Sequence, residues 1–223
     1  KKLFTLRKNK KSDVLPFRFI KKNNVKKIFL KTGNEKISFD IKNVNIYNIL
    51  ASVAVLKELN LNLNSINKIF KKVEPTEGRG KNHTILRYNK KFRLIDESYN
   101  ANPLSVKNAI KNFDEIKKKK SKKYLILGDM LELGHKSEQY HTDLSKVINN
   151  SNIDKVFIKG EKTLFTYKNL HKSKQGNILQ NKNDIDLILN GIINNNDYLM
   201  IKGSNATGLN SFAKKMIKGI NAI

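Results

Sequence analysis

The sequence contains no cysteine, and this absence removes two kinds of structure from consideration. A chain without thiols has neither a disulfide framework nor a cysteine-ligated metal site. It also has no apolar run approaching about 18 residues, which excludes a transmembrane helix, and its lysine-rich start is not a signal peptide. The sequence therefore predicts a soluble cytoplasmic protein with no membrane partner.

Acidic residues are scarce, because 19 Asp and Glu accompany 45 Lys and Arg, which gives a formal net charge of +26. Charge of this size is typical of proteins that bind nucleic acid or anionic membranes. The lysines are nevertheless spread through every segment, and aromatic residues make up only 8% of the chain. We therefore expect no specific nucleic-acid site. A basic nucleic-acid-binding module stays open as the alternative from a different class of protein.

The 223 residues suffice for one large or two small domains. A stretch rich in Pro and Gly, Pro75 to Gly80, separates two patterns and is the predicted domain boundary, which divides the chain into residues 1–76 and 77–223. Before it we expect strands at 27–31 and 36–41 around a hairpin-like turn, a helix at 47–59 and a helix from a Ser65 cap to residue 70.

Beyond the boundary, short apolar segments alternate with segments of helical periodicity. This alternation is typical of an α/β fold with a mostly parallel sheet that helices cover on both faces. The expected strands are residues 84–87, 92–96, 124–127, 155–158 and 198–201. The expected helices are residues 103–116, 137–148, 163–170, 184–193 and 208–217.

Three strand-to-helix loops, after Ile95, Leu127 and Ile201, carry conspicuous polar groups. Parallel strands place such loops at one edge of the sheet, so we expect them to line a common cleft. In the first loop, Asp96, Asn100 and Asn102 are placed to bind a ligand, and Pro103 then begins a helix.

The third loop, Lys202-Gly203-Ser204, follows an apolar strand and precedes a helix, so it is a candidate anion-binding turn. It lacks the Gly-x-x-x-x-Gly-Lys pattern of a P-loop, and a tight turn satisfied by its own side chains is an equal alternative. Asp129, Glu132 and His141 fit no metal signature, so no metal site is predicted. For these three we favour a structural or substrate-positioning role over proton transfer. The remaining histidines, His83, His135 and His171, are expected at the surface.

The chain resembles the Mur ligases of peptidoglycan synthesis in several motifs that occur in the family's order. These are Ile-Asp-Glu-Ser-Tyr-Asn-Ala-Asn-Pro at residues 95–103, Gly-Asp-Met-Leu-Glu-Leu-Gly at 128–134, His141, and Lys-Gly-Ser-Asn-Ala-Thr-Gly-Leu at 202–209. The resemblance implies the end of a central ATPase domain at 1–76 and a Rossmann-like C-terminal domain at 77–223. The family's P-loop, Gly-Thr-Asn-Gly-Lys-Thr in type, does not occur here. We therefore expect an incomplete fragment that is inactive alone.

Within the family, the motifs are similar to those of the branch that joins D-alanyl-D-alanine to UDP-N-acetylmuramoyl-tripeptide. The resemblance implies ATP and Mg²⁺ as cofactors, an acyl phosphate intermediate and a monomeric enzyme, and it assigns no catalytic residue here. The branch that adds the third stem-peptide residue is the alternative. Its Asp-Asn-Pro-Arg motif does not occur in this sequence.

The resemblance also implies roles for single residues. Asn45 would approach adenine, although Val44 stands where the family has a histidine; Arg79 would reach the ATP phosphates, and Asp96 would hold the ribose. Asn100, Asn102, Asp129 and Glu132 would hold the dipeptide. Other interpretations stay open: a chance helix cap for Asn45, an ordinary surface arginine for Arg79 and a helix-capping carboxylate for Asp96.

Overall fold

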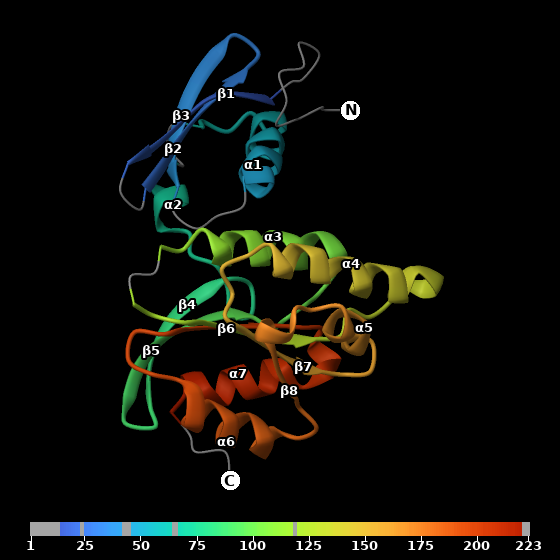
Figure 1. Ribbon diagram of the computed structural model, residues 1–223. Helices are drawn as coiled ribbons and strands as arrows, with labels where there is room; N and C mark the ends of the chain where they lie inside the picture. The colour runs from blue at the N-terminus through green and yellow to red at the C-terminus, as the bar shows by residue number, and fades with distance from the viewer. Residues whose placement is uncertain (1–13, 23–24, 42–45, 64–66, 118–119, 220–223) are drawn as a thin grey trace. The chain divides into compact units, whose positions relative to one another are not determined.

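The computed structural model describes residues 14–22, 25–41, 46–63, 67–117 and 120–219 (Figure 1). The chain divides into two compact units, Lys1–Pro75 and Thr76–Ile223, and each is described by itself. The division falls at the start of the stretch in which the sequence predicts a boundary. Val44, Asn45 and the predicted helix cap Ser65 lie outside the described residues.

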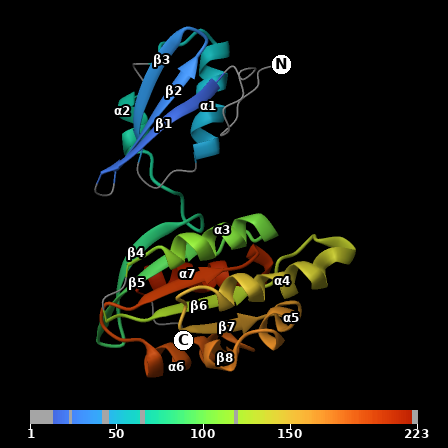
Figure 2. The same ribbon diagram turned by 45° about the horizontal axis from the view of Figure 1, so that its top comes forward.

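The first unit contains an antiparallel sheet in the order β1-β2-β3 and two helices (Figure 2). Alternate residues of the strands, among them Leu30 and Phe39, form an apolar face, and Leu50 and Val53 of α1 pack against it. The predicted hairpin at residues 32–34 is confirmed. The elements are β1 (Val14–Lys22), β2 (Val25–Thr32), β3 (Glu35–Ile41), α1 (Ile46–Glu58) and α2 (Asn67–Lys72).

The second unit is built on a six-stranded sheet in the order β4-β5-β9-β6-β7-β8. All neighbours pair in parallel except β4 and β5, so the predicted α/β fold with a mostly parallel sheet is confirmed. The strands are β4 (Lys81–Arg87), β5 (Lys90–Glu97), β6 (Lys123–Gly128), β7 (Lys155–Lys159), β8 (Gln175–Ile178) and β9 (Tyr198–Lys202).

Helices cover both faces of this sheet (Figure 1). The helices α3 and α4 pack on one face together with α5, while α6 and α7 pack on the other. The apolar residues of α3 recur at Val106, Ala109, Ile110 and Phe113, the spacing that puts them on one helix face. The helices are α3 (Pro103–Asp114), α4 (Ser137–Asn149), α5 (Thr163–Lys168), α6 (Lys182–Ile192) and α7 (Leu209–Ile217).

Two strands have no counterpart among the expected elements. In β1, Pro16 interrupts the pattern typical of a strand, and β1 tolerates it because it is an edge strand. The other, β8, is only four residues long, contains Gly176 and is partly exposed, so its periodicity is weak. A tight turn at Tyr88 and Asn89, both with positive φ, makes the β4–β5 hairpin antiparallel. None of the helices among the described residues is both long and apolar enough to span a membrane.

Candidate functional site

The three polar loops meet at the carboxyl edge of the sheet, because they follow the neighbouring strands β5, β9 and β6. The main-chain amide of Ser204 donates to the carbonyl of Asp129 at 3.1 Å, and the amide of Leu131 donates to Ser204 Oγ at 3.2 Å. Lys202 Nζ donates to the carbonyl of Asn100. The predicted convergence of the loops is thus confirmed by direct hydrogen bonds.

Asp96, the residue before the end of β5, is 0% exposed, and its carboxylate accepts hydrogen bonds from protein donors. Its Oδ2 accepts from the Gly78 amide at 2.8 Å, and its Oδ1 accepts from the amide and hydroxyl of Ser98 at 3.2 and 2.5 Å. The Gly80 amide donates to its main-chain oxygen at 2.8 Å. Asp96 therefore clamps the turn from Gly78 to Gly80 rather than capping α3. Its contact with a ribose stays a prediction.

The clamped turn presents Arg79 to solvent. Gly78 has a φ of +75°, and a Cβ there would lie 2.6 Å from the Cβ of Tyr99, so only glycine fits. The guanidinium carbon of Arg79 lies 4.6 Å from the centre of the Tyr99 ring, a cation–π contact. The Arg79 amide donates to the Thr76 carbonyl at 3.1 Å. Its guanidinium makes no hydrogen bond or ion pair within the described part of the chain, so the side-chain donors are available to an anion.

The two asparagines of the first loop differ in what their side chains do. Asn102 caps α3, because its Oδ1 accepts from the Ser105 amide at 2.8 Å while Ser105 Oγ accepts from the Asn102 amide at 3.0 Å. Asn100 Oδ1 accepts from the Ala101 amide at 2.7 Å, which leaves its exposed amide nitrogen as a donor. The geometry gives Asn102 a capping role and leaves Asn100 as the freer side chain.

The second loop uses Asp129 internally and exposes Glu132. Asp129 Oδ1 accepts from the Thr163 amide at 2.8 Å, at the start of α5. Gly160, with φ +125°, lies so close that a Cβ there would be 2.3 Å from the Asp129 carboxyl carbon. Glu132 adopts a φ of 60°, and its exposed carboxylate has no partner among the residues that the structure describes. The negative charge of Glu132 is thus directed to solvent.

His141 holds the second loop onto α4. It is 0% exposed, and its Nε2 accepts from the Met130 amide at 3.1 Å. Because Nε2 accepts, Nδ1 carries the proton, which it donates to the Ser137 carbonyl at 2.7 Å. Burial lowers the pKa of His141, with smaller opposing effects from Ser137 and Asp129. These contacts are those of the structural role that we favour from the sequence.

The candidate anion-binding turn is occupied by protein groups. Lys202 is 2% exposed, and both the amide and the hydroxyl of Ser204 are bonded to the second loop. Burial lowers the pKa of Lys202, an effect that the neighbouring Glu97 carboxylate opposes. These contacts fit the alternative of an internally satisfied turn, and anion binding by Lys202, Gly203 and Ser204 stays a prediction.

No group of three or more His, Cys, Asp or Glu side chains suited to a metal occurs among the described residues. His135 and His171 are exposed as expected. His83 corrects the expectation, because it lies on the face of β4 that carries the buried Ile85. Its Nε2 is buried without a hydrogen-bond partner among the described residues, and burial lowers its pKa.

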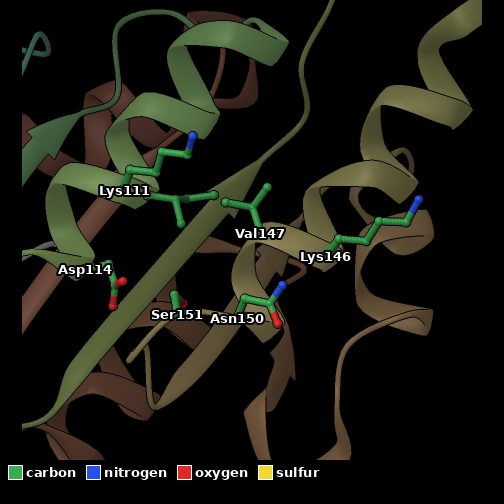
Figure 3. Close-up of a pocket in the computed structure, with 7 residues that line it drawn as sticks. Lys111, Asp114, Lys146, Val147, Asn150 and Ser151 are labelled. Atoms are coloured by element: carbon green, nitrogen blue, oxygen red, sulfur yellow. The ribbon is translucent and has the colours of Figure 1, made fainter.

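A groove of about 370 Å³ lies between α3 and α4, away from the polar loops (Figure 3). Asp114 at the end of α3 lines it, and the Asp114 carbonyl accepts from Lys123 Nζ at the start of β6. The groove is therefore at the amino edge of the sheet, opposite the site. Its lining residues are Ile110, Lys111, Asp114, Lys146, Val147, Asn150 and Ser151.

A mostly parallel sheet covered by helices, with three interlinked polar loops at its carboxyl edge, defines a Rossmann-like domain. The family described as "Mur ligase, glutamate ligase domain" matches residues 83–205, more than half of the chain. The chain therefore belongs to the Mur ligase family.

Among curated proteins, the chain is similar to two relatives named UDP-N-acetylmuramoyl-tripeptide–D-alanyl-D-alanine ligase. The relative from Bacillus subtilis is 30% identical over 129 residues, which are 56% of this chain and 28% of that protein. The relative from Buchnera aphidicola subsp. Baizongia pistaciae is 30% identical over 178 residues, 78% of this chain and 36% of that protein. The chain thus spans about a third of the length of these curated relatives.

Solved structures with the same fold include a MurF ligase from Thermotoga maritima in complex with ADP. It has a TM-score of 0.73 and 18% identity, over 93% of this chain and 46% of that chain. A MurF from Acinetobacter baumannii gives a TM-score of 0.75 and 21% identity, over 94% of this chain and 46% of that chain. Both comparisons support the fold.

Proposed function

We propose that this chain is the acceptor-side part of an ATP-dependent ligase that joins D-alanyl-D-alanine to UDP-N-acetylmuramoyl-tripeptide. The observation that carries the proposal is the meeting of the three motif loops at one edge of the sheet, with Arg79, Asn100 and Glu132 exposed there. The names of the curated relatives support the same reaction. A cytoplasmic location and a monomeric state go with this proposal and stay predictions.

The proposed reaction has two steps. The tripeptide carboxylate attacks the γ-phosphorus of ATP, so that ADP leaves and an acyl phosphate forms. The amine of D-alanyl-D-alanine then attacks the acyl carbon; the carbon–oxygen bond to phosphate breaks, and the amine loses a proton as the amide forms. Such chemistry depends mainly on positioning and on neutralising phosphoryl oxygens. Arg79, whose side-chain donors are free, is placed to contribute one of the required cations.

Mg²⁺ would supply further charge neutralisation at the phosphates. The described residues gather no set of carboxylates or histidines that fits this ion. We therefore assign no residue of the described segments to the metal and route no step through it.

The proposed acceptor, D-alanyl-D-alanine, is a zwitterion that needs acceptors for its ammonium group and donors for its carboxylate. The exposed carboxylate of Glu132 offers the first, and the side-chain amide of Asn100 offers the second. Asn102 and Asp129 use side-chain oxygens to hold the helices α3 and α5 that flank the loops, and their own contact with the dipeptide stays a prediction. Asp96, Lys202 and Ser204 at this edge already have protein partners, which leaves the exposed side chains to select the ligand.

The test is to measure ADP release with ATP, UDP-N-acetylmuramoyl-tripeptide and D-alanyl-D-alanine. It uses the complete protein, expressed from the full gene that contains this sequence. We expect ADP release that requires both the tripeptide and the dipeptide. We expect none from the 223-residue chain by itself, because it contains no P-loop pattern to hold the phosphates. Release that instead requires a UDP-N-acetylmuramoyl-dipeptide together with a single amino acid would assign the protein to the other branch of the family.

A further inference from the structure

Lys202 is a buried cation that ties two loops of the carboxyl edge together. Its Nζ donates to the carbonyl of Asn100 and, at 3.3 Å, to the carbonyl of Glu97. The Glu97 carboxylate lies 3.7 Å from the same Nζ. Glu97 and Lys202 are direct partners on the parallel strands β5 and β9, so the sheet itself sets this pairing. All three acceptors belong to the end of β5 and the loop behind it.

This place is unfavourable for an ammonium group. Only 2% of Lys202 is exposed, and burying a charge carries a desolvation cost that its partner only partly offsets. Asn100 also lies just before Asn102, the N-cap of α3, where the helix dipole disfavours a nearby cation. A methionine would fill a similar volume without either cost. What the lysine gains at this cost is its hold on the Asn100 and Glu97 carbonyls.

We propose that Lys202 is a positioning residue for the dipeptide acceptor and that Glu97 holds Lys202 in place. The bond from Lys202 Nζ fixes the main chain at Asn100, whose side-chain amide is exposed for the dipeptide carboxylate. The inference rests on the proposed function and deepens it, because it makes the Lys202–Glu97 ion pair responsible for the position of the loop that would bind the dipeptide. The dipeptide itself does not touch Lys202.

The experiment uses Lys202→Met in the complete encoded protein and follows the Michaelis constants for dipeptide and for ATP separately. Asn100→Ala serves as the reference for losing the exposed amide. We expect Lys202→Met to raise the dipeptide KM by roughly tenfold or more, the scale for one lost charge-assisted hydrogen bond, with little change in the ATP KM. A dipeptide KM that stays at the wild-type value, or equal rises for both substrates, would overturn the inference.

Lys123→Met is the matched control. Lys123 is also buried, 1% exposed, and its Nζ donates to the Asp114 carbonyl at 2.8 Å, at the opposite edge of the sheet. We expect Lys123→Met to lower the urea midpoint of unfolding without a selective change in the dipeptide KM. If Lys123→Met raised the dipeptide KM as much as Lys202→Met, the effect would be one of general stability and the inference would fail.

The double variant Glu97→Gln with Lys202→Met separates charge balance from positioning. Removing both charges should return the urea midpoint toward that of the wild type, because no unpaired buried charge is left. The dipeptide KM should stay high, because the bond to the Asn100 carbonyl is still missing. A dipeptide KM that returned to normal would overturn the inference. Wild-type protein without dipeptide-dependent ADP release would instead refute the proposed function itself, so the two failures are distinguishable.

Discussion

Asp96 and Arg79 show how neighbouring residues at one edge divide between holding the structure and meeting a ligand. The Asp96 carboxylate is buried and receives three hydrogen bonds, whereas the exposed guanidinium of Arg79 lies over the Tyr99 ring. Both are predicted to face the nucleotide. Their different surroundings make the two substitutions distinguishable.

Asp96→Ala should lower both stability and nucleotide use, while Arg79→Ala should lower nucleotide use alone. Asp96→Ala leaves the Gly78 amide and Ser98 without their acceptor, and we expect a loss of about 1–3 kcal/mol in the free energy of unfolding. Arg79→Ala removes an exposed side chain, so stability should change by no more than about 0.5 kcal/mol. Urea unfolding of the chain and ATP kinetics of the complete protein measure the two effects. Unchanged ATP kinetics in both variants would contradict the predicted nucleotide contact.

His141 should make the stability of the second unit depend on pH. Burial lowers its pKa in the folded chain below the ordinary 6.5. Above pH 6.5 the ring is neutral in both the folded and unfolded states, so its contribution is fully present. As the pH falls from 6.5 toward the lower folded pKa, the ring becomes protonated in the unfolded chain while it stays neutral in the folded chain. The free energy of unfolding therefore decreases.

The measurement compares urea unfolding between about pH 5 and pH 7.5 for the wild type, His141→Gln and His135→Gln. His141→Gln should flatten the dependence, whereas His135→Gln, which changes an exposed histidine, should leave it as in the wild type. His83, whose pKa burial also lowers, contributes in the same direction and is present in all three proteins. An equal slope in all three would show that His141 is not the responsible group.

At the scale of elements, the N-terminus of α3 combines a capping function with a predicted acceptor contact. Asn102→Ala removes the capping oxygen and should cost about 1 kcal/mol, whereas Asn102→Ser keeps a cap and should cost little. If Asn102 also touches the dipeptide, Asn102→Ser should raise the dipeptide KM although the chain keeps its stability. A dipeptide KM that changes only in Asn102→Ala would limit Asn102 to its cap.

Glu132→Ala is the companion variant for that test. Its exposed carboxylate has no partner in the described part of the chain, so the urea midpoint should not move. A selective rise in the dipeptide KM would support contact with the ammonium group of the acceptor. Equal effects on dipeptide and ATP would indicate that Glu132 only shapes its loop.

Most elements of the second unit follow from local pattern. The strand β6 is an unbroken buried run, and α3 and α7 each place four apolar residues at helical spacing, so their positions agree with the sequence prediction. The strand β8 escapes prediction because its four residues include a glycine and two exposed positions. Its pairing with β7, a non-local interaction, makes it a strand.

For the whole molecule, the division into two compact units predicts that residues 76–223 fold alone. Both apolar clusters of the second unit consist entirely of residues from that unit. We expect the 76–223 segment to unfold in one cooperative urea transition, with the midpoint that this part shows within the 223-residue chain. Circular dichroism of the two proteins measures this. A 76–223 segment that lacks a cooperative transition would contradict the independence of the unit.

The sequence by itself determined the α/β class, the order of most strands and helices along the chain, and the three loops that carry polar residues. These features depend on local periodicity and on Pro and Gly at turns, which a linear pattern contains. The family motifs added the expected chemistry. The sequence thus predicted that the three loops meet at one edge of the sheet, and the family motifs named Arg79 and Glu132 among the candidate site residues.

Only the tertiary structure decided which polar groups of that place remain available. Asp96 meets Gly78, Asp129 meets Thr163, and Lys202 meets Asn100 across 18, 34 and 102 residues of sequence. No local pattern contains such partners, because they depend on which strands lie side by side and how closely their loops approach. Buried polar groups are almost always hydrogen-bonded, and the tertiary structure determines which partner each one has. The same residue types therefore hold the loops together in one position and face solvent in the next.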